Sequence, residues 1–349
     1  MRISHLFSST LVALLISGCA PKSIPQQLAT KSPPQSIVEI AFDDHLTVAV
    51  DVNDFRQVTG SYYDELERER GFLWEAENGF TDLGSLGGDR TSPFAINNKG
   101  QIVGMANTAQ GHTRAFLWSA EEGMKELGTL GGDSNRAHDI NNQGQVVGES
   151  YLGNGRYHAF FYSPDTGMQD LGALQNMDST AEMILESGKV LGSHISLDAQ
   201  EFFFIWDPKT GRQDLSLEDR FADFQPDSLT ETGELMGYST LHGAPMLFAP
   251  NGRPYNLGPL QEYGAGSVIA KLPDGTYLAK VNEVSDIDSS FFRFSQTMPP
   301  TPIPLQGHEL SAIKEHNALG DILLSARDSE GKFVSLLVRV KLNPSAAGK

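Results

Sequence analysis

One motif recurs along this chain at a nearly constant spacing, and that spacing constrains the fold more than any other feature. Residues 95–104 read Ala-Ile-Asn-Asn-Lys-Gly-Gln-Ile-Val-Gly, and residues 139–148 read Asp-Ile-Asn-Asn-Gln-Gly-Gln-Val-Val-Gly. The glycine that ends the motif, which we call the ruler glycine, recurs at steps of 44, 44, 44 and 45 residues: Gly60, Gly104, Gly148, Gly192 and Gly237. Weaker copies near residues 275–279 and 320–324 keep a similar spacing. The pattern predicts seven units, which fill nearly all of the chain after residue 36.

Each unit contains four pieces with the composition of short β-strands. In the second unit they are residues 92–97, 101–105, 115–118 and 124–127. The Asn-Asn-Lys-Gly that joins the first two is typical of a tight turn, because Asn and Gly tolerate positive φ. Four antiparallel strands in about 40–50 residues are the signature of a β-propeller blade. We therefore predict an all-β, seven-bladed β-propeller.

The two ends of the repeat region predict how the ring closes. The last unit ends after its third strand, residues 333–340, whereas residues 37–40 precede the first unit in the register of a fourth strand. We expect this N-terminal strand to complete the seventh blade and to cover an otherwise open sheet edge. An aromatic residue also recurs in the third strands, and we expect it to pack adjacent sheets rather than to stack on sugars or bases: Trp74, Trp118, Tyr162, Trp206, Phe248 and Phe294.

The first 18 residues have the features of an export signal. Arg2 precedes an apolar stretch at residues 6–16, which is too short to span a bilayer comfortably. Ile16-Ser17-Gly18-Cys19 resembles a bacterial lipobox, and Cys19 is the only cysteine of the chain. The resemblance implies acylation of Cys19, including palmitate, and a stable membrane anchor. The residue after Cys19 is Ala20 rather than Asp, which favours the outer membrane; a plain signal peptide is the alternative.

Residues 19–36 are predicted to be the lipidated cysteine and a tether, and residues 37–349 the propeller. The tether is rich in Pro, Ser and Gln and has few apolar residues to pack. Seventeen extended residues reach at most about 55–60 Å. The chain carries a net charge of −18, which repels phosphate backbones and therefore disfavours nucleic acid as a partner.

The repeat units resemble a known family. His158-Ala159-Phe160 precedes Asp170-Leu171-Gly172, and residues 127–132 read Leu-Gly-Thr-Leu-Gly-Gly. These residues are similar to the HAF repeat of exported bacterial proteins. The match is close over residues 51–172, partial in the fourth and fifth units, and reduced to length and strand pattern in the last two. The resemblance implies an exported repeat protein and brings no catalytic residues.

The loops between the fourth strand of one unit and the first strand of the next are expected to share one face with the hairpins between second and third strands. Such a face is where a ligand or partner binds. The candidate polar residues of this ligand face are Asp89, Arg90, Asp133, Arg136, His138 and Asp178. The simpler interpretation is that Gly-Gly-Asp forms a tight turn whose carboxylate accepts backbone N–H bonds.

The sequence contains no recognised catalytic, metal or cofactor motif: no HExxH, no phosphate-binding loop, no Gly-x-Ser-x-Gly and no ladder of calcium ligands. We therefore predict no cofactor, no metal site and no catalytic residue. The favoured function is a monomeric ring that serves as an envelope-anchored binding or scaffold module for protein partners. A propeller hydrolase or lyase acting on glycans or peptides, and a carbohydrate-binding propeller, are the alternatives.

Overall fold

The computed structural model consists of β-strands and the turns between them. It describes residues 36–41, 45–175, 177–198, 200–215, 223–242, 244–249, 252–255, 266–272, 274–281, 291–295, 301–303, 308–317 and 319–339. These residues contain no helix, and so none that could cross a membrane. The signal segment, Cys19 and the tether lie outside the described residues.

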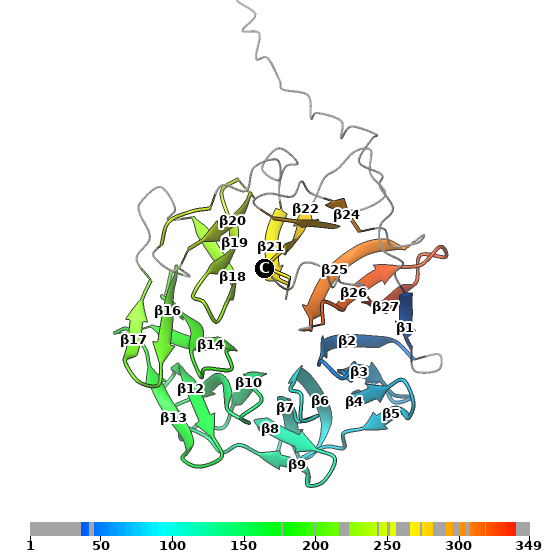
Figure 1. The fold of residues 1–349 in the computed structure, drawn as a ribbon. Coiled ribbons are helices and arrows are strands. Elements are labelled where there is room, and N and C mark those ends of the chain that lie inside the picture. Colours follow the sequence, from blue (N-terminus) through cyan, green and yellow to red (C-terminus); the bar gives the residue numbers. More distant parts are fainter. Residues whose placement is uncertain are drawn as a thin grey trace, which may run out of the picture.

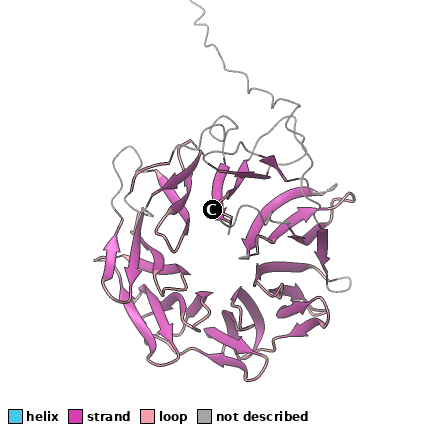
Figure 2. Cartoon of the chain, viewed as in Figure 1, coloured by secondary structure: helices cyan, strands magenta, loops and turns pink. Residues whose placement is uncertain are grey.

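The described residues form seven antiparallel sheets around a common centre (Figure 1), and Figure 2 shows strands in every part of the ring. Their strands are β1 (Ser36–Ile40), β2 (Thr47–Val52), β3 (Val58–Tyr63), β4 (Glu69–Glu75), β5 (Gly79–Asp82), β6 (Gly87–Ile96), β7 (Ile102–Thr108), β8 (Thr113–Ser119), β9 (Gly123–Glu126), β10 (Asn135–Ile140), β11 (Val146–Tyr151), β12 (Tyr157–Ser163), β13 (Gly167–Gly172), β14 (Asp178–Ile184), β15 (Val190–Ile195), β16 (Glu201–Asp207), β17 (Gly211–Asp214), β18 (Phe224–Leu229), β19 (Leu235–Ser239), β20 (Pro245–Phe248), β21 (Gly266–Lys271), β22 (Tyr277–Val281), β23 (Phe291–Phe294), β24 (Thr301–Pro302), β25 (Glu309–His316), β26 (Ile322–Arg327) and β27 (Phe333–Arg339). The predicted all-β propeller architecture is confirmed.

Most sheets are built from strands that follow one another in the chain, as in the order β6-β7-β8-β9. One sheet differs, because its order is β1-β27-β26-β25. In it β1 pairs antiparallel with β27, from Ser36 opposite Arg339 to Ile40 opposite Ser335. The N-terminal strand therefore lies beside the third strand of the last repeat.

The innermost strand of each sheet (Figure 1) is the first strand of its repeat, namely β2, β6, β10, β14, β18, β21 or β25, and it contains a β-bulge. In β10 the register passes from Ala137 to Asp139, which leaves His138 without a cross-strand partner. The bulge brings the preceding carbonyl over the neighbouring strand: a Cβ on Gly148 would lie 2.0 Å from the Arg136 oxygen. This close approach explains why the ruler position is glycine in the repeats with the strongest motif.

A column of fully buried phenylalanines forms the layer between sheets. Its members are 44 residues apart and 0% exposed: Phe72, Phe116, Phe160, Phe204, Phe248 and Phe292. Phe72 pairs across the strands with Gly60, so the ring fills the space that the ruler glycine leaves open. The aromatic residues predicted to pack between sheets fall into two groups. Three are buried, namely Trp118, Phe248 and Phe294, and three are partly buried and pack against the clusters of these phenylalanines, namely Trp74, Tyr162 and Trp206.

Candidate functional site

A cavity of about 450 Å³ lies at the centre of the ring, where the first strands end. We call this the turn end of the ring, because it holds the turns from the first to the second strands, such as residues 97–101. The opposite end holds the hairpins from second to third strands, and we call it the hairpin end. The cavity is lined by residues of six sheets: Asp51, Val52, Asn53, Asp54, Phe94, Ala95, Ile96, Asn97, Asn98, His138, Asp139, Ile140, Asn142, Glu182, Met183, Glu186, Asp227, His316 and Asn317.

Buried asparagines hold the turns around this cavity together. In the second unit Asn97 Oδ1 accepts the N–H groups of Lys99 and Gln101, both at 3.0 Å, and so fixes its own turn. Its Nδ2 donates to the carbonyl of Asn141 in the next sheet, at 2.9 Å. Asn53 donates in the same way to the carbonyl of Asn97. The motif therefore specifies a bond between sheets as well as a turn.

Two of the carboxylates in the cavity wall also join neighbouring sheets. Asp51 accepts the N–H of Val52 at 2.6 Å and that of Ile96, in the next sheet, at 2.7 Å. Asp139 repeats this arrangement with Ile140 and Ile184, both at 2.7 Å. Each of these two carboxylates therefore links neighbouring sheets through bonds to main-chain N–H groups.

One residue in each bulge lies outside the cross-strand register, and its chemistry differs from sheet to sheet. Phe94, His138, Glu182 and Asp227 occupy this one position of successive first strands, and all four line the cavity. The column places an aromatic ring, an imidazole and two carboxylates around one space. Of these four residues, only His138 was predicted from the sequence as a candidate site residue.

The environment of the cavity shifts the pKa values of Glu182 and His138 in opposite directions. Burial raises the pKa of Glu182, and the charges of Glu201 and Asp227 add to that rise. Ser193 Oγ donates to Glu182 Oε1 at 2.8 Å, and this hydrogen bond lowers the pKa and so opposes the rise. Burial lowers the pKa of His138, so its imidazole is neutral near pH 7.

The hydrogen bonds of His138 also fix its tautomer. Its Nδ1 lies 3.2 Å from the Ala181 carbonyl, which can only accept. Thr180 Oγ1 lies 3.3 Å from the same nitrogen and can accept as well. A proton on Nδ1 satisfies both contacts and leaves the lone pair on Nε2. Glu182 and His138 thus form a weak acid and a weak base that line the same space.

The other five predicted residues of the ligand face lie at the hairpin end, apart from the cavity. Arg90 Nε donates to Glu69 Oε2 at 2.8 Å, and Arg136 pairs with Glu149 at 3.0 Å. Asp89 accepts a 3.4 Å bond from Asn107, and Asp133 lies 3.8 Å from His112 Nδ1. Each is engaged with a neighbouring strand or hairpin, and a ligand role for these five stays a prediction.

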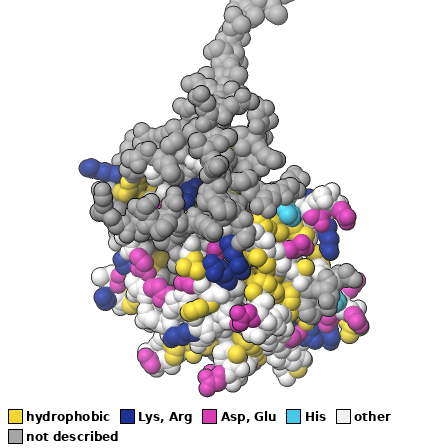
Figure 3. Space-filling model, turned by 45° about the vertical axis from the view of Figure 1, so that its right-hand side comes forward, with side chains coloured by type: hydrophobic (Ala, Val, Ile, Leu, Met, Phe, Trp, Pro, Cys, Tyr) yellow, Lys and Arg dark blue, Asp and Glu magenta, His cyan; other side chains and the backbone are white. Residues whose placement is uncertain are grey.

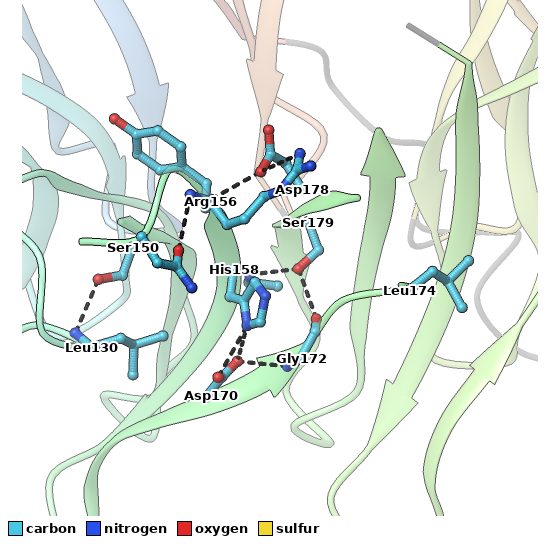
Figure 4. A network of polar contacts seen from close by, with 12 residues as sticks. Leu130, Ser150, Arg156, His158, Asp170, Gly172, Leu174, Asp178 and Ser179 are labelled. Atoms are coloured by element: carbon cyan, nitrogen blue, oxygen red, sulfur yellow. Dashed lines mark hydrogen bonds and ion pairs between the residues drawn. The ribbon is translucent and has the colours of Figure 1, made fainter. Parts of the chain in front are cut away.

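Asp178 belongs to a polar network that connects two sheets (Figure 4). It accepts the Tyr157 N–H at 3.0 Å and pairs with Arg156 at 3.7 Å. In the same network Ser179 Oγ donates to the Gly172 carbonyl at 2.7 Å and accepts the Ala159 N–H at 2.8 Å. Both of these hydrogen bonds of the Ser179 hydroxyl are therefore made to main-chain groups.

His158 of the same network lies 3.0 Å from the carboxylate of Asp170 (Figure 4). The three residue types of a Ser-His-Asp triad are thus near one another, but the serine hydroxyl bonds to backbone groups. A nucleophilic triad requires that hydroxyl to bond to the imidazole. The network therefore joins the strands of the His-Ala-Phe repeat. Among the described residues, no group of three or more His, Cys, Asp or Glu is placed to hold a metal ion.

Comparisons with known proteins find the fold. No family model and no curated protein matches the chain. Among solved structures, the β-propeller domain of the Trilobed protease from Pyrococcus furiosus is 10% identical with a TM-score of 0.58, covering 84% of this chain and 95% of that one. A catalytically inactive virginiamycin B lyase from Staphylococcus aureus with quinupristin is 11% identical with a TM-score of 0.53, covering 87% and 99%. YCF48 bound to D1 peptide is 12% identical with a TM-score of 0.52, covering 92% and 100%. At these identities the likeness shows a β-propeller and no more.

Proposed function

We propose that the protein is a non-catalytic, envelope-anchored binding or scaffold module whose protein partner docks at the cavity. The charge of the cavity carries this proposal. Its described lining holds six carboxylates (Asp51, Asp54, Asp139, Glu182, Glu186 and Asp227) and no Lys or Arg. A rigid, concave surface of one charge sign attracts and orients a partner of the opposite sign. Binding of such a partner therefore requires these carboxylates and no catalytic group.

We also propose that the seven sheets are seven blades of one ring, closed by the N-terminal strand. The pairing of β1 with β27 supports this, and so does the 3.1 Å bond from the Ala49 N–H to Ser335 Oγ. A chain that lacks residues 36–42 would expose the edge of β27 and should aggregate. A soluble, monomeric truncation that melts cooperatively would contradict the closure.

Membrane anchoring through Cys19 and membership of the HAF-repeat family complete the proposal. The lipobox-like sequence before Cys19 and the repeat motifs support them. In cells given labelled palmitate, the wild-type protein should take up label and partition with membranes. Cys19→Ala should do neither, and a variant that still partitions with membranes would contradict lipid anchoring.

Site-specific photo-crosslinking tests the partner and the docking site together. Lys99 and Gln110 are exposed residues at opposite ends of one sheet, Lys99 at the turn end and Gln110 in the hairpin between β7 and β8. A photoreactive amino acid placed at 99 in tagged full-length protein should capture a defined envelope protein in cells. The same group at 110 is the matched control. Equal capture from both positions, or none from 99, would contradict docking at the cavity.

The opposite pKa shifts of His138 and Glu182 favour one second candidate, a hydrolase or lyase acting on glycans or peptides. A neutral imidazole accepts a proton, and a carboxyl group whose pKa is raised by burial is a better proton donor to a leaving group than an exposed one. Turnover of a glycan or peptide panel by the wild type, lost in both His138→Gln and Glu182→Gln, would establish this candidate. It would also overturn the non-catalytic proposal.

A further inference from the structure

The turn end of the ring carries two exposed apolar side chains beside the acidic cavity. Phe55 is 71% exposed and Leu319 is 43% exposed. They occupy the same position of two neighbouring turns, those that follow β2 and β25. In the turns of the next three sheets this position holds Lys99, Gln143 and Ser187. The apolar pair is therefore a local departure from the repeat, and we call Phe55 and Leu319 the apolar rim.

The rim is held in place by the bonds that join its two turns. Asn317 Nδ2 donates to the Asn53 carbonyl at 3.1 Å, and Arg56 Nε donates to Asp321 Oδ2 at 2.8 Å. Asp54 and Asn317, which flank the rim in sequence, both line the cavity. The rim is thus a fixed edge of the cavity on the side of the first and last repeats.

The opposite side of the cavity is acidic. Glu182 and Asp227 come from β14 and β18, three and four sheets along the ring from β2, and the Asp227 charge acts on Glu182. A guanidinium or ammonium group placed between them would relieve that repulsion and form charge-assisted hydrogen bonds. The cavity volume of about 450 Å³ falls within the roughly 300–1,000 Å³ of ordinary ligand sites and accommodates such a side chain.

Figure 3 presents one face of the molecule with side chains coloured by type. Hydrophobic side chains gather near the middle of that face, and acidic and basic ones lie around them. An exposed apolar side chain next to a charged recess is a common anchor arrangement in protein interfaces, where a few residues supply most of the affinity.

We propose that the cavity and its apolar rim recognise an extended segment of a protein partner in which a Lys or Arg lies a few residues from a large apolar residue. The cation enters the cavity toward Glu182 and Asp227, and the apolar side chain packs on Phe55 and Leu319. This inference rests on the proposed function, and it names the chemistry of the partner segment.

Peptide binding to the full-length protein tests the inference. The probe is a fluorescently labelled seven-residue peptide of Gly and Ser with one Arg and one Leu three residues apart. Matched probes replace Arg by Gln or Leu by Ser. The Arg and Leu probe should bind with a Kd at least tenfold below that of either matched probe, and raised salt should weaken it because the contact is ionic. Equal affinity for the Arg and Gln probes would overturn the inference.

Protein variants locate the binding. Phe55→Ser and Glu182→Gln should each weaken the Arg and Leu probe by about tenfold. Leu66→Ser is the control, because Leu66 is 70% exposed in the same sheet as Phe55 but in the hairpin between β3 and β4. Binding that survives Phe55→Ser, or that Leu66→Ser weakens equally, would overturn the inference. Crosslinking from position 99 without probe binding would leave the proposed function intact, whereas failure of both would remove it as well.

Discussion

The side-chain amide of Asn317 donates a 3.1 Å hydrogen bond to the main-chain carbonyl of Asn53, although 264 residues separate the two. The same bond joins Asn53 to Asn97, Asn97 to Asn141, and Asn141 to Leu185. One residue of the repeat therefore both shapes its own turn and fastens its sheet to the next. The junction of the first and last repeats uses the same device as the junctions within the chain.

Removal of one such amide should cost more than removal of an exposed one. Asn97 is 3% exposed, and Asn97→Ala would leave the N–H groups of Lys99 and Gln101 without their acceptor and would remove one of two donors to the Asn141 carbonyl. We expect the free energy of unfolding to fall by about 2–3 kcal/mol. Asn154→Ala, in the exposed hairpin between β11 and β12, is the control and should change it by less than about 1 kcal/mol. Denaturant titration measures both, and equal losses would contradict a special role for Asn97.

Two substitutions of Arg56 distinguish the effect of backbone strain on stability from the effect of the ion pair with Asp321. Arg56 has a φ of 62° where the corresponding residue of the second and third repeats is glycine, Gly100 and Gly144. Arg56→Ala keeps the left-handed backbone but leaves Asp321, whose side chain is 2% exposed, without its cation, and should cost about 2 kcal/mol. Arg56→Gly also removes the strain and should be more stable than Arg56→Ala by about 1 kcal/mol. A glycine variant no more stable than the alanine variant would show that the strain is negligible.

The ruler glycine should tolerate no side chain. A Cβ at Gly148 would lie 2.0 Å from the Arg136 oxygen and 2.9 Å from Phe160 Cε1. Gly148→Ala should lower the free energy of unfolding by about 3 kcal/mol, because strand or ring must shift. Gly167→Ala, at a φ of 72° with no atom within 4 Å, should cost only the roughly 1 kcal/mol of left-handed strain. Thermal melts of the pair test this order, and a reversed order would contradict it.

His194 should make stability depend on pH. The ring is fully buried, stacks on Phe204 at 4.7 Å and accepts the Leu174 N–H at Nδ1. Burial, with a smaller effect from Arg212, lowers its pKa to about 4, against about 6.5 in the unfolded chain. Between these values the unfolded state binds more protons, so stability should fall as pH falls from about 6.5 to about 4 and change no further through this group below that.

His194→Ser provides the comparison for that pH dependence. Ser150 occupies the same position one repeat earlier, and its Oγ accepts the Leu130 N–H at 3.1 Å. The serine variant should keep this bond and flatten the fall in stability between pH 6.5 and 4, whatever its stability at neutral pH. An unchanged slope in that range would assign the pH dependence to other groups.

The repeat spacing was sufficient to predict the propeller, because a strand, a turn and a strand of fixed lengths recur with recognisable residues. The turn of residues 97–100 was predicted from the tolerance of Asn and Gly for positive φ, and Gly100 is the residue that adopts it, at 69°. The role of Asn97 as a link between sheets was not predicted, because a single repeat gives no sign of what the next sheet offers.

One residue of the candidate site, His138, was expected on a loop face, and other residues of the site were not predicted. His138 was assigned to a loop face, but β10 begins at Asn135, and the bulge turns His138 toward the cavity. Glu182 and Asp227 were overlooked. Residues 94, 138, 182 and 227 keep the repeat spacing while their chemistry changes from Phe to His, Glu and Asp, and that variation within a regular repeat was the available signal.

The register of the N-terminal strand places the attachment of the tether at the same end of the ring as the cavity. Ile37 pairs with Val338, which pairs with Ile322 beside the turn at Asn317, so β1 starts at the turn end. If Cys19 is acylated, the tether reaches the ring at its turn end, which then lies no farther from the lipid surface than the roughly 55–60 Å of an extended tether. Partners in or near the same membrane would then be within reach of the cavity, so that their distance from the bilayer matters as well as their charge.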